Sequence, residues 1–531
     1  MPVSTASVAV PNSSPGVRHS AARDLVIALS LVNLAFLRVW SEILTYARVD
    51  TYLMKTPPPP PVYYAAIADV VAGGLILWGL VAVCRRYTPS LYRWVQIAFL
   101  ASLALPLNAI REILSVHFPY LRSPILDLVG SRGVLLIAGI LAVAAVWLIA
   151  VYHRSASRVA SVVAFFFPFV PLTFGQAIWK ATHYDASAYQ AKLAPLIPNA
   201  RALPRILWVI CDEWDYSLTF EDRDPTLSLP EVDRLRQETL FASNAYPPGP
   251  ATPISIPGYV TGKLVKDVAY GGPRTLILRF RNTQPMVPLD PNSTVFHKVR
   301  AMGLNAAVVG WFHPYCRLFQ DDLVSCDWWE LAMQHNSMGR TFTDAFWGEP
   351  RSLFETTLLS PFGQSLSLKH HAATHDVILS EAKQIADNPQ YEFTYVHLPT
   401  PHAPFPYNRR TGRFDLANTV VKGYIDSLAL LDRTLGELRQ SMESAHLWDD
   451  TTVLITTDHS YRQAGELHGK FDPRIPFLLK LAGQHQGLAY DRPFNAILDQ
   501  ELLLAVLNNQ VTDAAGAARW LDEHRTTQPL D

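Results

Sequence analysis

The sequence predicts a multi-span α-helical membrane domain followed by an α/β domain with a largely parallel central sheet. Up to about residue 180 the chain is rich in Leu, Ala, Val and Phe with few charges, whereas the part beyond residue 200 has the composition of a soluble domain. Beyond residue 205, short apolar runs alternate with helical patterns, as in sheets whose strands are joined by covering helices. A chain of 531 residues is also too long for one hydrophobic core.

Five apolar segments are predicted to cross a membrane. Each is close to the ~20 residues that span ~30 Å of hydrocarbon. A single such segment would also fit a buried helix of a soluble protein, but five in succession with charged flanks favour a membrane. The third segment is the least regular, because Pro106, Asn108, Arg111 and Glu112 stand in its later half. The five segments are 24–45, 63–84, 94–114, 133–152 and 159–179.

Basic residues near the predicted spans indicate their orientation. Positively charged residues gather on the cytoplasmic side of membrane proteins. One side holds Arg18, Arg23, Arg85, Arg86, Arg93, Arg154 and Arg158, and the other holds Arg48, Lys55, Arg122 and Arg132 over longer stretches. The bias places the amino terminus in the cytoplasm, and an odd number of spans then places everything after residue 180 outside it.

The domain organisation follows from these spans. We expect a cytoplasmic tail at 1–22, five transmembrane helices within 23–180, a juxtamembrane linker at 181–203 and an extracytoplasmic domain at 204–531. The tail lacks the short apolar core of a cleavable signal peptide, so the first span is expected to be retained. The prolines at 57–61 predict a stiff spacer in the first external loop.

Net charge and cysteine positions narrow the possible functions and the kinds of site. A formal net charge of -1 gives no general basic field for nucleic acid. Cys316 and Cys326 lie close together in the proposed external domain, where a disulfide is plausible. A zinc pair is the weaker alternative, because no second Cys/His pair follows at finger spacing. Cys84 and Cys211 are expected to be free.

The second part shows the strand and helix pattern of a doubly wound sheet. Continuous apolar runs predict strands at 206–211, 305–310, 393–397, 453–457 and 477–481, and helices are predicted at 232–240 and 420–444. Ligands in such sheets gather beyond the carboxyl ends of the strands. Asp212, His313, His402, Asp458 and His459 all lie at or shortly after predicted strand ends. They form the candidate site.

Several motifs, in order along the chain, resemble those of one enzyme superfamily. They are Leu-Trp-Val-Ile-Cys-Asp-Glu-Trp at 207–214, Leu-Pro-Glu-Val-Asp-Arg-Leu at 229–235, Thr-Pro-Ile-Ser-Ile-Pro at 252–257 with Thr-Gly-Lys at 261–263, His-Leu-Pro-Thr-Pro-His-Ala-Pro-Phe at 397–405, Thr-Thr-Asp-His at 456–459, Leu-His-Gly-Lys at 467–470 and Arg-Ile-Pro-Phe at 474–477. The segment 205–505 resembles the sulfatase and alkaline phosphatase superfamily. It is most similar to the membrane-anchored phosphoethanolamine and phosphoglycerol transferases, which share the layout of five spans before an external catalytic domain.

The resemblance implies a metal site and a threonine nucleophile. Thr252, Asp212, Asp458 and His459 correspond to the metal ligands, with Glu213 as the alternative to its neighbour Asp212. Mixed oxygen and nitrogen ligands favour one divalent zinc ion, with manganese as the alternative and a second metal left open. His402 and His468 are assigned to binding the phosphate or protonating the leaving oxygen, with metal ligation or a structural loop role as alternatives. The role of His313 stays open.

The resemblance also implies which residue is the nucleophile. Sulfatases convert a Cys or Ser in the pattern Cys/Ser-x-Pro-x-Arg to formylglycine, and the segment Ser255-Ile-Pro-Gly-Tyr259 lacks the arginine. In sulfatases the modified residue stands nine positions before the threonine of a Thr-Gly pair, which here is Thr252 relative to Thr261. An unmodified threonine is what the resembled phosphotransferases use. Ser255 remains the alternative, and its structural explanation is a capping hydroxyl.

The predicted activity is a two-step transfer at a membrane surface. Thr252 would take a phospholipid head group, with phosphatidylethanolamine and phosphatidylglycerol as candidate donors, and pass it to an envelope glycan or lipid. The resemblance implies a bacterial-type inner membrane with the catalytic domain in the periplasm. One alternative is a membrane-tethered hydrolase, either phosphatase, phosphodiesterase or sulfatase. The other is a non-catalytic envelope scaffold on the same fold.

Overall fold

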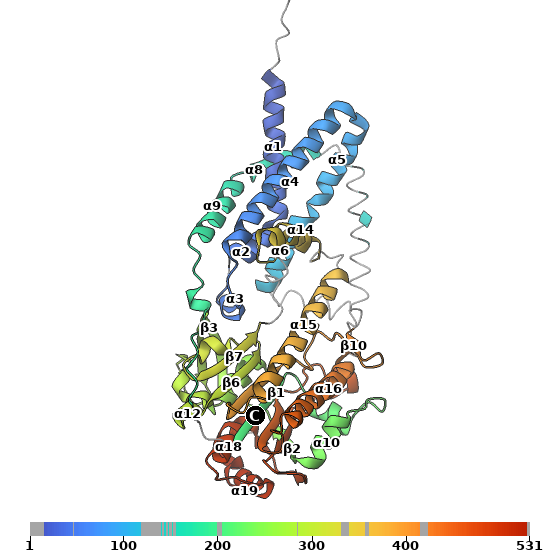
Figure 1. Cartoon of the computed structure of the whole chain (residues 1–531). Helices are drawn as coiled ribbons and strands as arrows, with labels where there is room; N and C mark the ends of the chain where they lie inside the picture. The colour runs from blue at the N-terminus through green and yellow to red at the C-terminus, as the bar shows by residue number, and fades with distance from the viewer. Residues whose placement is uncertain are drawn as a thin grey trace, which may run out of the picture. The chain divides into compact units, whose positions relative to one another are not determined.

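The structure is a computed structural model that forms two compact units (Figure 1). It describes residues 15–45, 47–117, 140, 143–144, 147, 151, 156–198, 204–283, 285–330, 339–355, 361–414 and 423–527. The first unit comprises residues 1–46, 58–184 and 334–360, and the second comprises 47–57, 185–333 and 361–531. The segments 47–57 and 334–360 thus each belong to a different unit from the residues on either side of them in sequence.

The first unit is helical. Within the described residues, two helices are long and apolar enough to cross a membrane, Pro60–Tyr87 and Arg158–Thr182. A third span is possible if Ala21–Ala35 and Leu37–Leu44, which meet at a bend of 57°, act as one. The helices are α1 (Pro15–Ala35), α2 (Leu37–Leu44), α4 (Pro60–Tyr87), α5 (Pro89–Ser102), α6 (Ala104–His117), α8 (Ala156–Phe165), α9 (Phe169–Thr182) and α14 (Phe342–Glu355).

The expected count of five spans is not reached among the described residues. The predicted span at 94–114 falls on α5 and α6, which are separate helices with a shorter apolar stretch at Trp94–Ile110. The predicted span at 133–152 lies outside the described residues, apart from a few isolated positions. The predicted spans at 63–84 and 159–179 fall on the two helices that are long and apolar enough to cross a membrane. The predicted span at 24–45 falls on the bent pair of helices.

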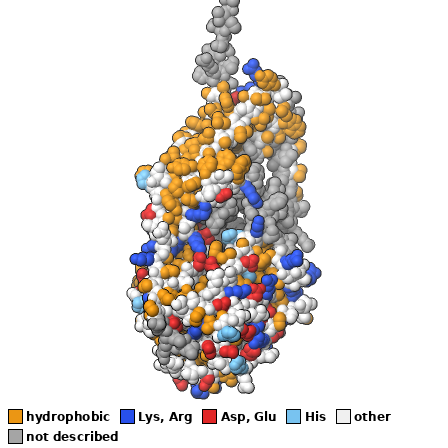
Figure 2. All heavy atoms as spheres, in the orientation of Figure 1, with side chains coloured by type: hydrophobic (Ala, Val, Ile, Leu, Met, Phe, Trp, Pro, Cys, Tyr) orange, Lys and Arg blue, Asp and Glu red, His pale blue; other side chains and the backbone are white. Residues whose placement is uncertain are grey.

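The helices of the first unit expose many apolar side chains. Ile76 on α4 is 72% exposed and Phe165 on α8 is 79% exposed. Figure 2 shows hydrophobic side chains gathered over this unit. An apolar surface of this extent is typical of a protein or membrane contact. The unit also has a buried cluster of its own, to which α14 contributes Ala345 and Leu353.

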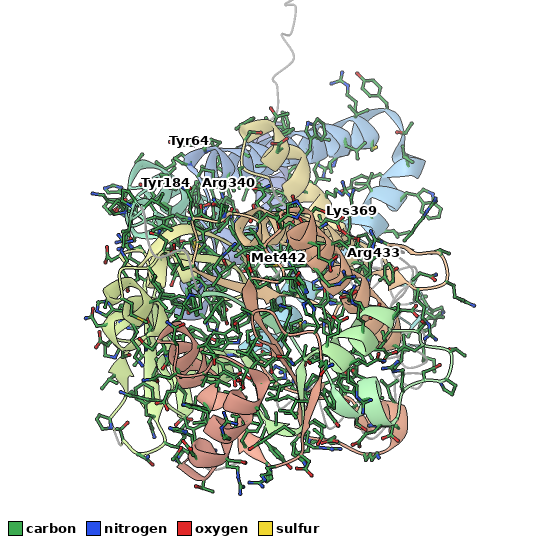
Figure 3. The ribbon with its side chains drawn as sticks, turned by 60° about the horizontal axis from the view of Figure 1, so that its bottom comes forward. Tyr64, Tyr184, Arg340, Lys369, Arg433 and Met442 are labelled. Atoms are coloured by element: carbon green, nitrogen blue, oxygen red, sulfur yellow. A yellow bond between two sulfur atoms is a disulfide. The ribbon has the colours of Figure 1, made fainter. Side chains whose placement is uncertain are left out.

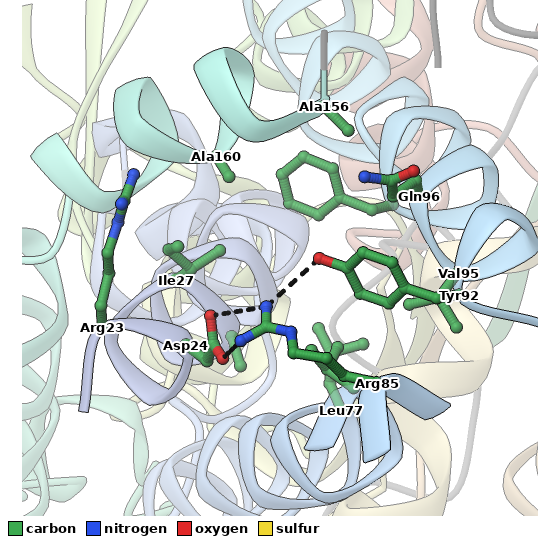
Figure 4. A pocket seen from close by; sticks show the side chains of 13 residues that line it. Arg23, Asp24, Ile27, Leu77, Arg85, Tyr92, Val95, Gln96, Ala156 and Ala160 are labelled. Atoms are coloured by element: carbon green, nitrogen blue, oxygen red, sulfur yellow. Dashed lines mark hydrogen bonds and ion pairs between the residues drawn. The ribbon is translucent and has the colours of Figure 1, made fainter. Parts of the chain in front are cut away.

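A cavity of about 230 Å³ lies between α1, α4, α5 and α8 (Figure 4). Most of its lining is apolar, and two of its charged groups, Asp24 and Arg85, pair with each other. The Arg85 guanidinium lies 2.5 Å from Asp24 Oδ2 and donates to the Tyr92 hydroxyl at 3.2 Å. These contacts join α4 to α1 and α5 within the unit.

The second unit is built on a mostly parallel sheet. Among the described residues it has nine strands, in the order β13-β2-β12-β11-β1-β8-β6-β7 with β14 paired to β2. Strands β11, β1, β8, β6 and β7 are mutually parallel, whereas β12 runs antiparallel to β11 and β2. The strands are β1 (Arg205–Cys211), β2 (Leu240–Tyr246), β6 (Ala306–Trp311), β7 (Leu323–Trp329), β8 (Phe393–Leu398), β11 (Thr451–Thr457), β12 (Ile475–Lys480), β13 (Leu488–Tyr490) and β14 (Phe494–Asn495). The predicted α/β domain with a largely parallel central sheet is confirmed.

Two core layers cover the two faces of this sheet. Side chains alternate along a strand, so Ile206, Trp208 and Ile210 of β1 enter one layer and Leu207, Val209 and Cys211 enter the other. The first layer includes residues of α11 (Thr252–Thr261), α12 (Val295–Ala301), α18 (Asp499–Leu507) and α19 (Ala514–His524). The second includes residues of α10 (Pro230–Glu238), α15 (Pro361–Ala386) and α16 (Gly423–Ser444), with Met442 of α16 buried in it (Figure 3).

The remaining elements of the second unit are short. They are α3 (Arg48–Leu53), α13 (Tyr315–Leu318), α17 (Gly465–His468), a small sheet of β3 (Val265–Gly272), β4 (Thr275–Phe280) and β5 (Val287–Pro288), the hairpin β9 (Tyr407–Asn408) and β10 (Arg413–Phe414), a π-helical turn at Ser217–Glu221, and 3₁₀ turns at Ser187–Tyr189, Pro291–Ser293, Ala496–Leu498 and Arg525–Thr527. A disulfide joins Cys316 of α13 to Cys326 of β7. Cys84 and Cys211 are free and buried, so the predictions for the cysteines are confirmed.

A buried ion pair between α10 and α16 is expected to be important for stability. Glu231 and Arg439 are both less than a tenth exposed, and their side chains form two bonds of 2.6 and 2.8 Å. Replacing Glu231 with alanine leaves the buried guanidinium with Glu443, at 2.6 Å, as its remaining carboxylate partner, so we expect a cost of about 3 kcal/mol, the lower end of the range for a broken buried pair. Thermal unfolding of the purified protein, followed by tryptophan fluorescence, should show a midpoint lower by roughly 5–10 °C.

The matched control for this prediction is Arg433 on the same helix (Figure 3). Its side chain is 55% exposed and pairs with Glu437 four residues on. Exposed pairs of this kind contribute less than about 1 kcal/mol, so Arg433→Ala should leave the midpoint nearly unchanged. Equal shifts for the two variants would contradict the prediction.

Candidate metal centre

The candidate centre lies where β1 and β11 end. These strands are parallel neighbours, with Cys211 opposite Thr457. Asp212 follows β1, and Asp458 and His459 follow β11, so the sheet brings all three side chains to one edge. Thr252 is the first residue of α11, which belongs to the core layer on one face of the same sheet.

The predicted ligands of the metal lie close together. Thr252 Oγ1 lies 3.3 Å from Asp212 Oδ2 and 3.5 Å from His459 Nε2. His459 Nε2 lies 3.4 Å from Asp458 Oδ2 and 3.9 Å from Asp212 Oδ1. Asp212, Asp458 and His459 each offer one ligand atom, and these atoms lie within 4.8 Å of one another. A metal ion can therefore be held by this buried group.

The hydrogen bonding of the two carboxylates fits a cation. Asp458 Oδ1 accepts from the backbone N–H groups of Glu213 and His459, at 3.1 and 2.9 Å. No hydrogen-bond donor among the described residues reaches Asp212 Oδ1 or Asp458 Oδ2, although both atoms are buried. Buried carboxylate oxygens that accept no hydrogen bond are costly, and a bound cation would offset that cost. Oxygen and imidazole ligands together suit a divalent metal such as zinc.

The charges of the site shift its pKa values in opposite directions. Burial alone would raise the pKa of the Asp212 carboxyl, but the imidazoles of His402, His397 and His459 outweigh it and hold the pKa below its usual range. Burial would lower the pKa of His459, but Asp458 and Asp212 outweigh it and raise that pKa. The arrangement keeps the Asp212 carboxylate ionised, as metal ligation requires.

Asp212 and Glu213 point in different directions. Glu213 has a left-handed backbone conformation, with φ of 63°, directly after the strand. Its carboxylate accepts from Arg462 Nε at 2.6 Å and lies 3.8 Å from His402 Nε2. Because the Asp212 carboxylate faces Thr252 and His459 while Glu213 is paired with Arg462, the geometry favours Asp212 as the ligand.

The start of α11 suits a nucleophile. Ala251 is extended, and Pro253 stands in the first turn, where a missing N–H is tolerated. The free amides and dipole of a helix N-terminus favour negative charge, such as a phosphoryl group on Thr252. Ser255, the alternative nucleophile, donates its hydroxyl to the carbonyl of Gly249 at 2.8 Å and is fully buried. Its contacts are those of a structural hydroxyl.

The predicted histidines have different surroundings. His402 lies beside the centre: its ring centroid is 5.1 Å from that of Trp311, and its Nδ1 bonds its neighbour's carbonyl at 2.5 Å, which leaves Nε2 facing Glu213. His468 ends α17, where its Nδ1 contacts the Ala464 carbonyl at 2.9 Å and its Nε2 lies 4.0 Å from Asp222. None of these contacts of His468 is to the three-residue metal group.

His313 and His397 also contact the centre. His313 Nε2 lies 3.4 Å from the carbonyl oxygen of Thr252, and burial lowers the pKa of its imidazole to about 3, so the ring is neutral. His397 Nε2 lies 3.6 Å from Asp212 Oδ2, and its Nδ1 bonds the Tyr315 hydroxyl at 2.8 Å. Sequence reasoning left His313 open and did not name His397 or Arg462 as site residues. His397 lies on β8 opposite Ile210, two residues before Asp212, and this register is visible only in the folded sheet.

Comparisons with known proteins give one family match and several similar solved structures. The model of the Sulfatase family matches residues 204–499, which is more than half of the chain. One similar solved structure is Ps i-CgsB, with 15% identity and a TM-score of 0.41 over 57% of this chain and 72% of that chain. Another is the phosphonate monoester hydrolase of Agrobacterium radiobacter, with 14% identity and a TM-score of 0.38 over 58% of this chain and 74% of that chain. A third is an alkaline phosphatase superfamily protein from Vibrio parahaemolyticus, with 15% identity and a TM-score of 0.36 over 61% of this chain and 71% of that chain. No curated protein sequence matches. The chain belongs to the sulfatase family and is an enzyme of the sulfatase superfamily.

Proposed function

We propose that this enzyme is a metal-dependent phosphotransferase that moves a phospholipid head group through a phospho-threonine intermediate. The observation that carries the proposal is the place of Thr252: its hydroxyl opens α11 and faces Asp212 and His459 of the buried group. The chain has no Cys/Ser-x-Pro-x-Arg sequence at this turn from which formylglycine would be made. An unmodified hydroxyl is suited to forming an ester with phosphorus.

The transfer consists of two displacements at phosphorus. In the first, Thr252 Oγ1 forms a bond to phosphorus, the bond from phosphorus to the diacylglycerol oxygen breaks, and that oxygen leaves as a hydroxyl with a proton. In the second, an acceptor hydroxyl forms the new bond to phosphorus, and Thr252 regains its proton as its ester breaks. We assign the supply and removal of these protons to His402, because its imidazole lies near enough to Asp212 to lower the pKa of that carboxyl, with its Nε2 3.8 Å from Glu213.

The residues of the centre fit a metal such as zinc, with manganese as the alternative. A divalent ion supplies Lewis acidity, which lowers the pKa of a bound hydroxyl and neutralises phosphoryl charge. Asp212, Asp458, His459 and Thr252 would hold it. Because the carboxylates are buried and His459 is oriented by the Ser460 carbonyl at 3.0 Å, the four groups are set before substrate arrives.

A membrane location fits the lipid donor. Helix α4 and the helical stretch Arg158–Thr182, which includes α9, are long and apolar enough to cross a membrane. We propose the five-span arrangement, with the catalytic domain on the periplasmic side of a bacterial-type inner membrane. The disulfide Cys316–Cys326 in the second unit supports an oxidising compartment. Phosphatidylethanolamine or phosphatidylglycerol would then be within reach as the donor. The acceptor would be an envelope glycan or lipid.

Product analysis tests this proposal. Purified full-length enzyme is incubated with membranes that contain phospholipid labelled in the head-group phosphate. We expect unlabelled diacylglycerol, a label on Thr252 located by mass spectrometry, and then a labelled envelope glycan or lipid. Sulfatase family membership supports a hydrolase as the second candidate, in which water is the acceptor. Release of the label as free head-group phosphate, with none on an acceptor, would establish the hydrolase and overturn the transferase.

A further inference from the structure

The segment 47–57 precedes α4 in sequence but belongs to the second unit. Tyr52 is fully buried, and it lies with Leu53 in the core layer that also contains Tyr259 of α11. The Arg317 guanidinium fixes the backbone here, because it donates to the carbonyls of Tyr52 at 2.5 Å and Met54 at 2.8 Å. Chain from the amino-terminal, helix-rich part of the sequence is therefore an integral part of the catalytic unit.

A second group of contacts holds the end of this segment. The Lys55 ammonium lies 2.6 Å from Asp327 Oδ1 and 4.2 Å from the ring centroid of Trp329. The backbone N–H of Lys55 donates to Glu330 at 2.5 Å. These bonds involve β7 and the residue after it, so the segment is tied to the unit at both its helix and its end.

The Tyr52 hydroxyl connects this segment to the nucleophile through one residue. It lies 2.8 Å from His313 Nδ1, and His313 Nε2 lies 3.4 Å from the carbonyl oxygen of Thr252. A carbonyl oxygen only accepts, so Nε2 carries the imidazole proton. Nδ1 is then the acceptor, and the Tyr52 hydroxyl donates to it. The hydroxyl thus selects the His313 tautomer that donates to Thr252.

The backbone before His313 also holds the ring in place. Phe312 has φ of 70°, a conformation that is uncommon for a large side chain and is kept only where surrounding structure fixes it. The His313 N–H donates to the Trp311 carbonyl at 2.9 Å, which makes the turn tight. The imidazole is 1% exposed, so its partners in this structure are protein groups.

We propose that Tyr52 is a positioning residue for the reaction, which acts through His313 to fix the first turn of α11 and with it the Thr252 hydroxyl. The inference rests on the proposed role of Thr252 as the nucleophile. Small displacements of a reacting group are costly in rate, because the attacking atom must meet phosphorus in line. Tyr52 therefore makes turnover depend on a segment that lies before the catalytic domain in sequence.

The test compares two tyrosines in the full-length enzyme. Tyr52→Phe removes only the hydroxyl. Tyr270→Phe is the matched control, because the Tyr270 ring packs on Tyr52 with centroids 4.9 Å apart. Hydrolysis of bis(4-nitrophenyl) phosphate is measured beside lipid head-group transfer. For Tyr52→Phe we expect kcat to fall about three- to tenfold, as for one lost hydrogen bond, with KM and bound zinc unchanged. Tyr270→Phe should match the wild type.

A double-variant cycle separates positioning from packing. If Tyr52 acts through His313, Tyr52→Phe should cause no further loss of kcat in a His313→Ala background. The inference is overturned if the losses of kcat in the two single variants multiply in the double variant. It is also overturned if Tyr52→Phe keeps the wild-type kcat. If Tyr52→Phe does not fold, His313→Gln is used in its place. Glutamine keeps a hydrogen-bond donor and an acceptor, so His313→Gln should retain more activity than His313→Ala. Equal losses of activity in these two variants would overturn the inference.

Hydrogen exchange gives a readout that needs no turnover. The amides of Ile254–Val260 should exchange faster in Tyr52→Phe than in the wild type, while those of α16 should not change. Unchanged exchange at α11 would overturn the inference even for an enzyme whose substrate is not found. Cleavage of the nitrophenyl diester without transfer of any lipid head group would instead reject the proposed function and leave the result for Tyr52 valid.

Discussion

Thr252→Ala is expected to lower the rate of the proposed head-group transfer by at least about 10⁴-fold, because it removes the proposed nucleophile. The labelled lipid assay should show neither released diacylglycerol nor labelled protein. The zinc content should fall only in part, since Asp212, Asp458 and His459 remain close together. Loss of the label with a folded protein is therefore the expected signature of a missing nucleophile.

Two control variants test whether Thr252 or Ser255 is the nucleophile. Thr252→Ser keeps a hydroxyl at the start of α11 and should retain measurable transfer. Ser255→Ala removes the alternative hydroxyl, which is bonded to the Gly249 carbonyl, and should retain transfer within about tenfold, because one neutral hydrogen bond is lost. Transfer by Thr252→Ala near the wild-type rate, or its abolition in Ser255→Ala alone, would exclude Thr252 as the nucleophile.

The second large effect is expected at Asp212. Asp212→Asn removes the charge from a buried oxygen pair at the end of β1, one member of which has no donor among the described residues. We expect bound zinc, measured by elemental analysis after dialysis, to fall from about one ion per chain to well under half. Turnover should fall by about 10³-fold or more, because the centre loses charge that both holds the metal and orients it.

Glu213→Gln is the matched control for Asp212→Asn. The two residues are adjacent acids, but the Glu213 carboxylate is paired with Arg462 at 2.6 Å instead of facing Thr252. Its variant should keep the full zinc content, whatever its effect on substrate binding. The reverse pattern, in which zinc is lost from Glu213→Gln and retained by Asp212→Asn, would show that the assignment of the ligand is wrong by one residue.

Much of the second unit was predictable because its strands are buried on both faces. A run such as 206–211 is apolar at every position, which identifies a central parallel strand without knowledge of its partners. The polar residue that ends such a run then lies at the functional edge of the sheet. Asp212, Asp458 and His459 were found in this way. His397 was not, because a histidine inside a strand does not reveal which neighbour it faces.

Other features depend on contacts between distant parts of the sequence. Residues 47–57 have the pattern of a connecting loop, and only the contacts with Arg317, His313 and Asp327 place them in the second unit. The segment that contains α14 has the composition of a soluble domain, yet it packs with α4 in the first unit. His468 contacts Ala464 in its own turn and Asp222 from a distant part of the sequence, and its motif specifies neither contact.

The docking of α3 has a practical consequence for protein production. A recombinant fragment that starts at residue 204 would keep every predicted metal ligand but omit Tyr52 and Leu53, two side chains that fill its interior. The hole would be lined by His313, Arg317 and the ring of Tyr270, so water would enter beside the start of α11. Low specific activity of such a truncated enzyme would then reflect an incomplete core and not a weak catalyst.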